Sequence, residues 1–208
     1  MLTDAVSINA HSSIRIAGEK VLYFDPFHLT EEPRDADLVL ITHDHYDHLS
    51  PEDIARVRKE GTVFVLPASC RESAEKNGLA PCVFLSPGET AEAAGVPVEA
   101  VAAYNVLKPF HPKKNGWLGY VVTVAGQRVY VAGDTDENKD NLSVKCDIAL
   151  VPAGGTYTFD AKHAARFVNK LRPAVAIPTH YGDIVGSLSD GDDFAAAVDD
   201  GIKVVRKI

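Results

Sequence analysis

Cysteine is scarce in this sequence, which contains only three cysteines among its 208 residues. Cys70, Cys82 and Cys146 lie far apart, form no C-x-x-C pair and are odd in number. This pattern argues against both a disulfide framework and a zinc site built on cysteine. We therefore expect a protein of a reducing compartment, the cytoplasm.

Positive charge is also in short supply, because 21 lysines and arginines stand against 29 aspartates and glutamates, for a formal net charge of -8. Nucleic acids and anionic membranes are bound through a basic surface, so we expect neither as a partner. The first five residues lack the pattern of a signal peptide, and no apolar run approaches the ~20 residues that span a bilayer. A small molecule is the expected partner, and a homo-oligomer remains open.

Strand-like and helix-like patterns alternate along the chain without an intervening linker or low-complexity stretch. Several of the expected strands follow one another too closely for a crossover helix, which disfavours a doubly wound parallel sheet. We predict an α+β fold, a four-layer αββα sandwich, as a single domain over residues 1–208. The expected strands lie near residues 6–8, 13–16, 21–25, 38–42, 63–66, 98–101, 120–124, 128–131, 148–151, 175–178 and 203–205.

Four helices are expected between these strands. The first is capped by Ser50, has Pro51 at its first position, and should run to about Lys59 and end at Gly61. The other three are expected near residues 69–77, 160–171 and 192–198.

Three histidines and two aspartates crowd the segment that joins the apolar run Leu38–Thr42 to the Ser50 cap, with the sequence His43-Asp44-His45-Tyr46-Asp47-His48. In an extended chain His43 and His45 point the same way, and the following turn brings Asp47 and His48 towards a neighbouring point. One loop can thus supply ligands to two metal ions. Imidazole and carboxylate donors suit Zn²⁺, with Mn²⁺ or Fe²⁺ as alternatives, and one or two ions are expected.

This segment resembles the H-x-H-x-D-H signature of the metallo-β-lactamase superfamily, and later motifs follow in the family's order. Phe24-Asp25-Pro26-Phe27, Gly133-Asp134-Thr135-Asp136 and Pro178-Thr179-His180-Tyr181-Gly182 resemble its other site segments. Asn9-Ala10-His11-Ser12-Ser13 is similar to the opening of a small cytosolic branch that includes ascorbate-6-phosphate lactonase-like proteins. The resemblance spans nearly the whole chain and implies the metallo-β-lactamase fold and a metal-dependent hydrolase.

The resemblance also implies a division of ligands between two metal ions. His43 and His45 would bind the first ion, Asp134 would bridge both ions, and the second ion would be bound by Asp47, His48 and His180. The third ligand of the first ion is open between His111 and Asn105, because the strand before it ends near Asn105. We favour His111, the only histidine between His48 and His163.

Two further residues are expected near the metal ions rather than on them. Asp25 is expected to accept a hydrogen bond from His48 or another ligating imidazole and so to orient it. For His11, a structural hydrogen bond and a role at the mouth of the site remain equally open.

The expected reaction is hydrolysis by a metal-bound hydroxide, with Asp47 or Asp134 receiving the proton. Lys108, Lys113 and Lys114 form the clearest basic cluster, which suggests a small anionic ester, lactone or phosphodiester, although three solvated lysines would look the same. The residues expected to contact substrate are Tyr157, Tyr181 and Lys108. A nucleic-acid hydrolase and a non-catalytic descendant that binds a metal or a metabolite are the alternatives.

Overall fold

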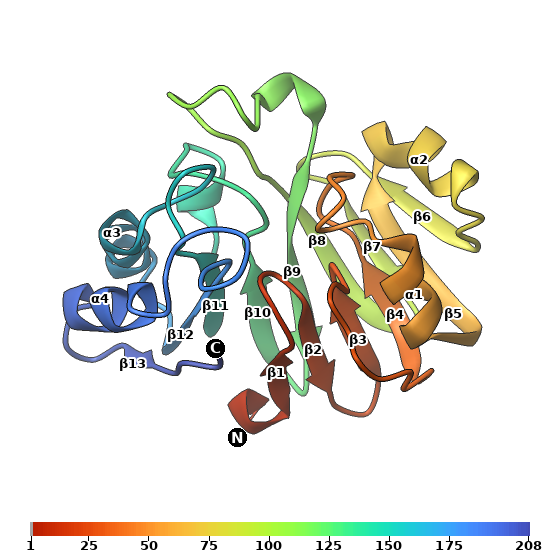
Figure 1. Ribbon diagram of the computed structural model, residues 1–208, viewed down its shortest axis with the longest axis horizontal. Coiled ribbons are helices and arrows are strands. Elements are labelled where there is room, and N and C mark those ends of the chain that lie inside the picture. The colour runs from red at the N-terminus through yellow and green to blue at the C-terminus, as the bar shows by residue number, and fades with distance from the viewer. Residues whose placement is uncertain (1) are drawn as a thin grey trace.

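Two β-sheets face each other in the computed structural model, which describes residues 2–208, and each sheet carries two α-helices on its outer side (Figure 1). The first sheet has the strand order β1-β2-β3-β4-β5-β6. Its first three strands pair antiparallel and the remaining pairs are parallel. These strands are β1 (Val6–Ile8), β2 (Ile14–Ala17), β3 (Val21–Phe24), β4 (Ala36–Leu40), β5 (Arg58–Pro67) and β6 (Cys82–Leu85).

The second sheet has the order β13-β12-β11-β10-β9-β8-β7. It is antiparallel from β7 to β10 and parallel from β10 to β13. Its strands are β7 (Thr90–Ala93), β8 (Val96–Ala102), β9 (Leu118–Val124), β10 (Gln127–Val131), β11 (Ile148–Pro152), β12 (Val175–Thr179) and β13 (Lys203–Val204).

Three apolar clusters hold the layers together. The largest lies between the two sheets and includes Leu38, Tyr120 and Leu150, none more than 1% exposed. A second joins the outer face of the first sheet to α1 (Pro51–Val57) and α2 (Arg71–Lys76). A third joins the second sheet to α3 (Ala161–Leu171) and α4 (Asp190–Ala197). Each sheet is therefore buried on both faces, and the predicted αββα sandwich is confirmed.

The first helix is shorter than the sequence indicated. Its cap is as expected, because the Ser50 side chain accepts a hydrogen bond from Asp53 N. The predicted end near Gly61 is wrong: the helix ends at Val57, and β5 begins at Arg58 in an extended conformation. Arg58 pairs with Ala36, and the Thr62 hydroxyl donates to Ala36 O, so cross-strand contacts override the helix-like composition of this charged segment.

Two strands, β6 and β7, were not predicted from the sequence. β6 is a short apolar run and β7 a short alternation of polar residues with alanine, and each spans only 4 residues, so neither gives a distinct strand signal in a single sequence. Both lie at the edge of a sheet, where pairing with one neighbour decides the conformation.

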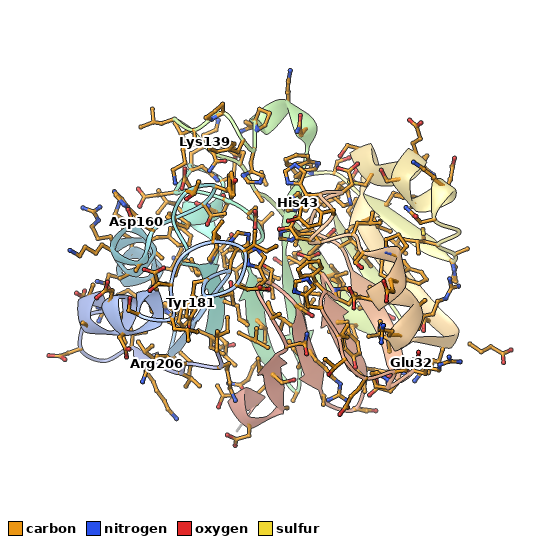
Figure 2. The ribbon with its side chains drawn as sticks, viewed as in Figure 1. Glu32, His43, Lys139, Asp160, Tyr181 and Arg206 are labelled. Atoms are coloured by element: carbon orange, nitrogen blue, oxygen red, sulfur yellow. The ribbon has the colours of Figure 1, made fainter. Side chains whose placement is uncertain are left out.

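The parallel strands deliver the polar residues to one end of the sandwich. β3 is followed by Asp25, β4 by His43, β10 by Asp134 and β12 by His180. Figure 2 shows His43 at this end of the strands, between the two pairs of helices. Carboxyl ends of parallel strands meet at one edge of a sheet, so residues far apart in the sequence become neighbours there. Between Leu2 and Ile208 no helix is long and apolar enough to cross a membrane.

Candidate metal centre

Possible metal ligands form three groups at this end of the sandwich, and the third, His43, His48 and Asp134, overlaps the other two. The first consists of His43, His45 and His111. The second consists of His11, Asp47, His48 and His180. Within each group the ligand atoms all lie within 4.8 Å of one another. Every metal ligand expected from the sequence therefore belongs to the first or second group or, in the case of Asp134, to the third.

Asp134 occupies the position expected of a shared ligand. Its Oδ2 atom lies 3.3 Å from His111 Nε2 of the first group and 3.1 Å from His180 Nε2 of the second. Its Oδ1 atom lies 3.4 Å from His48 Nε2. One carboxylate thus faces both groups, in a place where the side chain is only 4% exposed.

Buried polar atoms without a hydrogen-bond partner concentrate in these groups. Among the described residues, such atoms outside the site are only the hydroxyls of Tyr130 and Tyr181. Leaving a buried polar atom unpaired costs about 1–3 kcal/mol, so several in one place need a common partner. A metal cation accepts electron pairs from imidazole nitrogens and carboxylate oxygens together, and the residues fit such an ion. The unpaired atoms of the site are His11 Nδ1 and Nε2, His48 Nε2, His111 Nε2, Asp134 Oδ1, and His180 Nδ1 and Nε2.

Asp25 orients His48, as expected from the sequence. Asp25 Oδ2 lies 2.7 Å from His48 Nδ1. The same carboxylate accepts hydrogen bonds from the Thr42 amide and hydroxyl, at 2.8 and 2.6 Å. Because a carboxylate accepts, His48 Nδ1 carries the proton, and Nε2 is left to face Asp47 and Asp134.

Asn105 orients His111 in a similar way and does not take its place. Asn105 Oδ1 lies 2.8 Å from His111 Nδ1, and the backbone oxygen of Tyr157 lies 3.2 Å from the same atom. Both partners are acceptors, so Nδ1 carries the proton and Nε2 is free for a metal ion. The alternative in which Asn105 supplies the ligand is therefore not supported, because the Asn105 amide oxygen contacts His111 Nδ1, the ring nitrogen opposite the one that is free for a metal ion.

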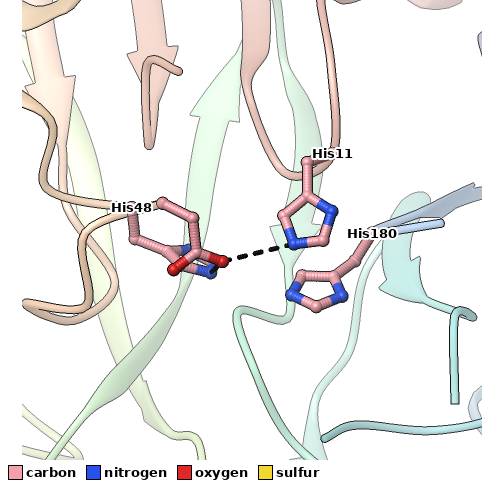
Figure 3. A group of neighbouring side chains, drawn as sticks. His11, His48 and His180 are labelled. Atoms are coloured by element: carbon pink, nitrogen blue, oxygen red, sulfur yellow. Dashed lines mark ion pairs between the residues drawn. The ribbon is translucent and has the colours of Figure 1, made fainter. Parts of the chain in front are cut away.

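His11 lies deeper in the site than the sequence suggested. Its Nε2 atom is 3.3 Å from Asp47 Oδ2, and its ring centroid is 3.6 Å from that of His180. Figure 3 shows the rings of His11, His48 and His180 turned towards a common space. His11 is 1% exposed and both of its ring nitrogens lack a hydrogen-bond partner, which argues against the purely structural hydrogen bond.

Electrostatics keep the Asp134 carboxylate charged and the imidazoles of His11, His43 and His111 neutral. Burial lowers the pKa of His11, His43 and His111, so their lone pairs are available at neutral pH. Burial alone would raise the pKa of Asp134, but the neighbouring His180 and His48 lower it well below its usual value. His48 is the exception, because Asp134 and Asp25 outweigh burial and raise its pKa. A metal cation must therefore compete with a proton at His48.

Trp117 forms an aromatic wall beside the first group, and the sequence analysis did not single it out. Its ring centroid lies 4.8 Å from that of His43, 4.7 Å from His45 and 5.5 Å from His111. It is the only tryptophan in the chain. Its intrinsic fluorescence is therefore a direct reporter on this group of histidines.

A cleft of about 360 Å³ opens onto both groups. Tyr157 lines it, as expected of a residue that contacts substrate. Tyr181 does not, because its side chain is 1% exposed and packs in the core beneath α3 and α4. The expectation that Tyr181 contacts substrate is therefore wrong.

The lysines expected to attract an anion are engaged elsewhere. Lys108 contacts the Asp136 carboxylate and the backbone oxygen of Thr158, and Lys113 lies 2.7 Å from Asp140 Oδ2. Neither these lysines nor Lys114 line the cleft. The basic cluster in the sequence therefore gives no support to an anionic substrate.

Gly154 permits a close approach that holds His180. A Cβ atom built on Gly154 would lie 2.1 Å from the backbone oxygen of His180, a contact that no backbone could accept unmoved. We expect Gly154→Ala to lower the free energy of unfolding by about 1–3 kcal/mol or more, and to lower the metal content by displacing His180. Thermal unfolding and elemental analysis measure both effects.

Gly18→Ala is the matched control for this variant. A Cβ atom at Gly18 would meet Val124 Cγ1 at 3.4 Å, an ordinary contact, so little change is expected. Equal stability and metal content for the two variants would contradict the role given to Gly154.

Comparisons with known proteins agree with this geometry. The family model described as the beta-lactamase superfamily domain matches residues 6–180. A UPF0173 metal-dependent hydrolase of Thermoplasma acidophilum is 32% identical over 205 residues, covering 90% of this chain and 88% of its own length. A second one, from Pyrococcus abyssi, is 32% identical over 215 residues, with 96% and 94% coverage. A crystal structure from Parabacteroides distasonis, described as a metal-dependent hydrolase, is 30% identical, has a TM-score of 0.80, and is matched over 97% of this chain and 91% of its own.

Proposed function

The chain belongs to the β-lactamase superfamily of metal-dependent hydrolases, and we propose that it hydrolyses a small ester, lactone or phosphodiester at a centre for two transition-metal ions. The observation that carries this proposal is the pair of adjacent ligand groups with Asp134 between them. A shared carboxylate between two sets of nitrogen and oxygen donors is the arrangement that two-metal hydrolytic sites use.

We assign the ligands as follows. The first ion would be held by His43, His45 and His111 and the second by Asp47, His48 and His180, and Asp134 would be shared between them. This donor set suits Zn²⁺, and it also accepts Mn²⁺ or Fe²⁺. When bound, such ions lower the pKa of a water molecule towards ~7 and polarise the oxygen of a scissile carbonyl or phosphoryl group.

Asp47 is the residue best placed to accept the proton released in hydrolysis. It lines the cleft, and its side chain is 13% exposed, whereas that of Asp134 is 4% exposed. Burial would raise the pKa of Asp47, but the close imidazoles of His11 and His48 lower it far below its usual value. Asp47 is thus ionised at neutral pH and holds a proton only transiently.

The first test is the metal content. Protein purified without chelator, or reloaded with Zn²⁺ or Mn²⁺, is expected to retain one to two ions per chain in elemental analysis, because the two ligand groups are already assembled. Loading should also change the fluorescence of Trp117, which contacts the first group. Less than about a tenth of an ion per chain after incubation with either metal would refute the proposal, since a preassembled site of this donor set binds tightly.

The two other functions considered from the sequence receive less support. A non-catalytic descendant was favoured by a missing ligand of the first ion, whereas His111 completes that group. A nucleic-acid hydrolase needs basic side chains along its cleft, and none of the described residues that line this cleft is lysine or arginine.

A further inference from the structure

Four large apolar side chains stand around the mouth of the cleft and are open to solvent. Tyr46 is 69% exposed, Phe110 43%, Tyr157 38% and Ile184 36%. They come from four different loops, those that follow β4, β8, β11 and β12. All four line the same cleft as the ligand groups. We call these four residues the apolar rim.

The rim is adjacent to the ligands in the chain as well as in space. Tyr46 lies between His45 and Asp47 in the sequence, and Phe110 directly precedes His111. Tyr157 contacts the first group through its backbone oxygen, which lies 3.2 Å from His111 Nδ1. The rim residues therefore line the cleft together with the metal ligands.

Two rim residues already form a fixed pair. The rings of Phe110 and Tyr157 meet edge to face, with centroids 4.8 Å apart. Asn105 connects the two loops, because its amide donates to Tyr157 O at 3.1 Å and its Oδ1 accepts at 3.0 Å from the backbone N of His111, the residue after Phe110. An aromatic surface that is held in place and left open to water favours the binding of another apolar group.

The charged residues that line the cleft also favour an uncharged group of the substrate. Among the described residues that line it, the charged side chains other than histidine are Asp47 and Asp134, and both contact histidines of the ligand groups. The nearest lysine in the sequence, Lys108, is held by Asp136 and Thr158 and lies outside the lining. The described lining of the cleft thus holds no lysine or arginine that would neutralise an anionic substituent.

We propose that the apolar rim binds an uncharged, ring-sized apolar group of the substrate next to the scissile bond, and that its four residues set substrate specificity. This inference rests on the proposed function, because it takes the reacting group to lie at the metal centre. Placing such a group in the cleft removes apolar surface of both partners from water, which is worth ~25 cal/mol per Å². A cleft of about 360 Å³ accommodates one ring beside the reacting group.

The test compares three hydroxamates that share one metal-chelating head. Acetohydroxamate has a methyl tail, benzohydroxamate a phenyl ring and succinic monohydroxamate a carboxylate. Their dissociation constants for zinc-loaded protein are measured by calorimetry and by the fluorescence of Trp117, so no turnover is needed. We expect benzohydroxamate to bind at least about tenfold more tightly than the other two, because its phenyl tail buries the most apolar surface.

Variants separate the effect of the rim from any intrinsic difference in how tightly the metal binds each hydroxamate. In a Phe110→Ala, Tyr157→Ala double variant that retains its metal content, the ratio of benzohydroxamate to acetohydroxamate affinity should fall about tenfold. Leu142→Ala is the matched control, since Leu142 is also 36% exposed but does not line the cleft, and it should leave the ratio unchanged.

The outcomes distinguish failure of this inference from failure of the proposed function. If metal-loaded protein binds none of the three hydroxamates, the open metal centre itself is refuted. If all three bind equally, or if the double variant keeps the wild-type ratio, the metal centre stands and the apolar rim does not set specificity. Tightest binding of the succinic compound would overturn the inference in favour of an anionic substrate.

Discussion

Asp134→Asn is expected to reduce turnover by on the order of 10³-fold or more while leaving the fold intact. The wild-type carboxylate lies within 3.1 to 3.4 Å of His48, His111 and His180 and is the one group that faces both ligand sets. An amide of the same shape carries no negative charge, so it cannot balance two cations in a site removed from water. The rate is measured on whichever lactone, ester or phosphodiester the wild type hydrolyses.

Asp44→Asn is the control for this replacement. Asp44 belongs to the same histidine-rich loop, but it is exposed, donates no ligand atom to either group and accepts a hydrogen bond from Ser73 at 2.8 Å. Turnover close to wild type is expected. If Asp134→Asn is as active as Asp44→Asn, Asp134 has no role in the reaction. If the wild type hydrolyses no compound of the three substrate classes, the proposal that the protein is a hydrolase fails.

His111→Ala should remove roughly one of two bound ions and lower turnover by about 100-fold or more, because it deletes one of three ligands of the first group. Elemental analysis gives the stoichiometry. The fluorescence of Trp117, whose ring lies 5.5 Å from that of His111, should no longer respond to metal as in the wild type. His163→Ala is the matched control, since His163 is exposed on α3 and pairs with Asp160.

Asn105 offers a finer version of the same experiment. Asn105→Leu removes the nearer of the two acceptors for His111 Nδ1 and should weaken metal binding about 10–100-fold, the usual effect of losing such a partner. Asn105→Asp keeps an acceptor at that position and should restore much of the affinity. If the leucine and aspartate variants bind metal equally well, Asn105 has no part in orienting the ligand; if His111→Ala retains both ions, the assignment of His111 fails.

Much of the site was predictable because its densest part is local in sequence. His43, His45, Asp47 and His48 occupy one short loop, and the turn after a strand is enough to aim them at two neighbouring points. Asp134 and His180 stand at the ends of apolar strands, which is also visible in the sequence. The contact between Asp25 and His48 followed from the need of a ligating imidazole for a second partner.

Other parts depend on contacts that no local pattern encodes. His11 enters the second group although nearly 170 positions separate it from His180. Its backbone φ of 52°, like the 44° of Asp25 and the 58° of His180, is a strained conformation that the surrounding packing imposes. Trp117 and Ile184 carried no signal in the sequence, since an isolated apolar residue near a strand or in a loop has no fixed destination.

The sequence by itself determined the donor chemistry and the alternation of strands and helices, because residue type and periodicity are local properties of the chain. Only the tertiary structure grouped His111 with His43 and His45, placed Tyr181 in the core, ended the first helix at Val57 and paired Lys108 and Lys113 with Asp136 and Asp140. Each of these outcomes depends on which segments the two sheets bring within a few ångströms of one another. That proximity is fixed by the packing of the whole chain, and spacing along the sequence does not record it.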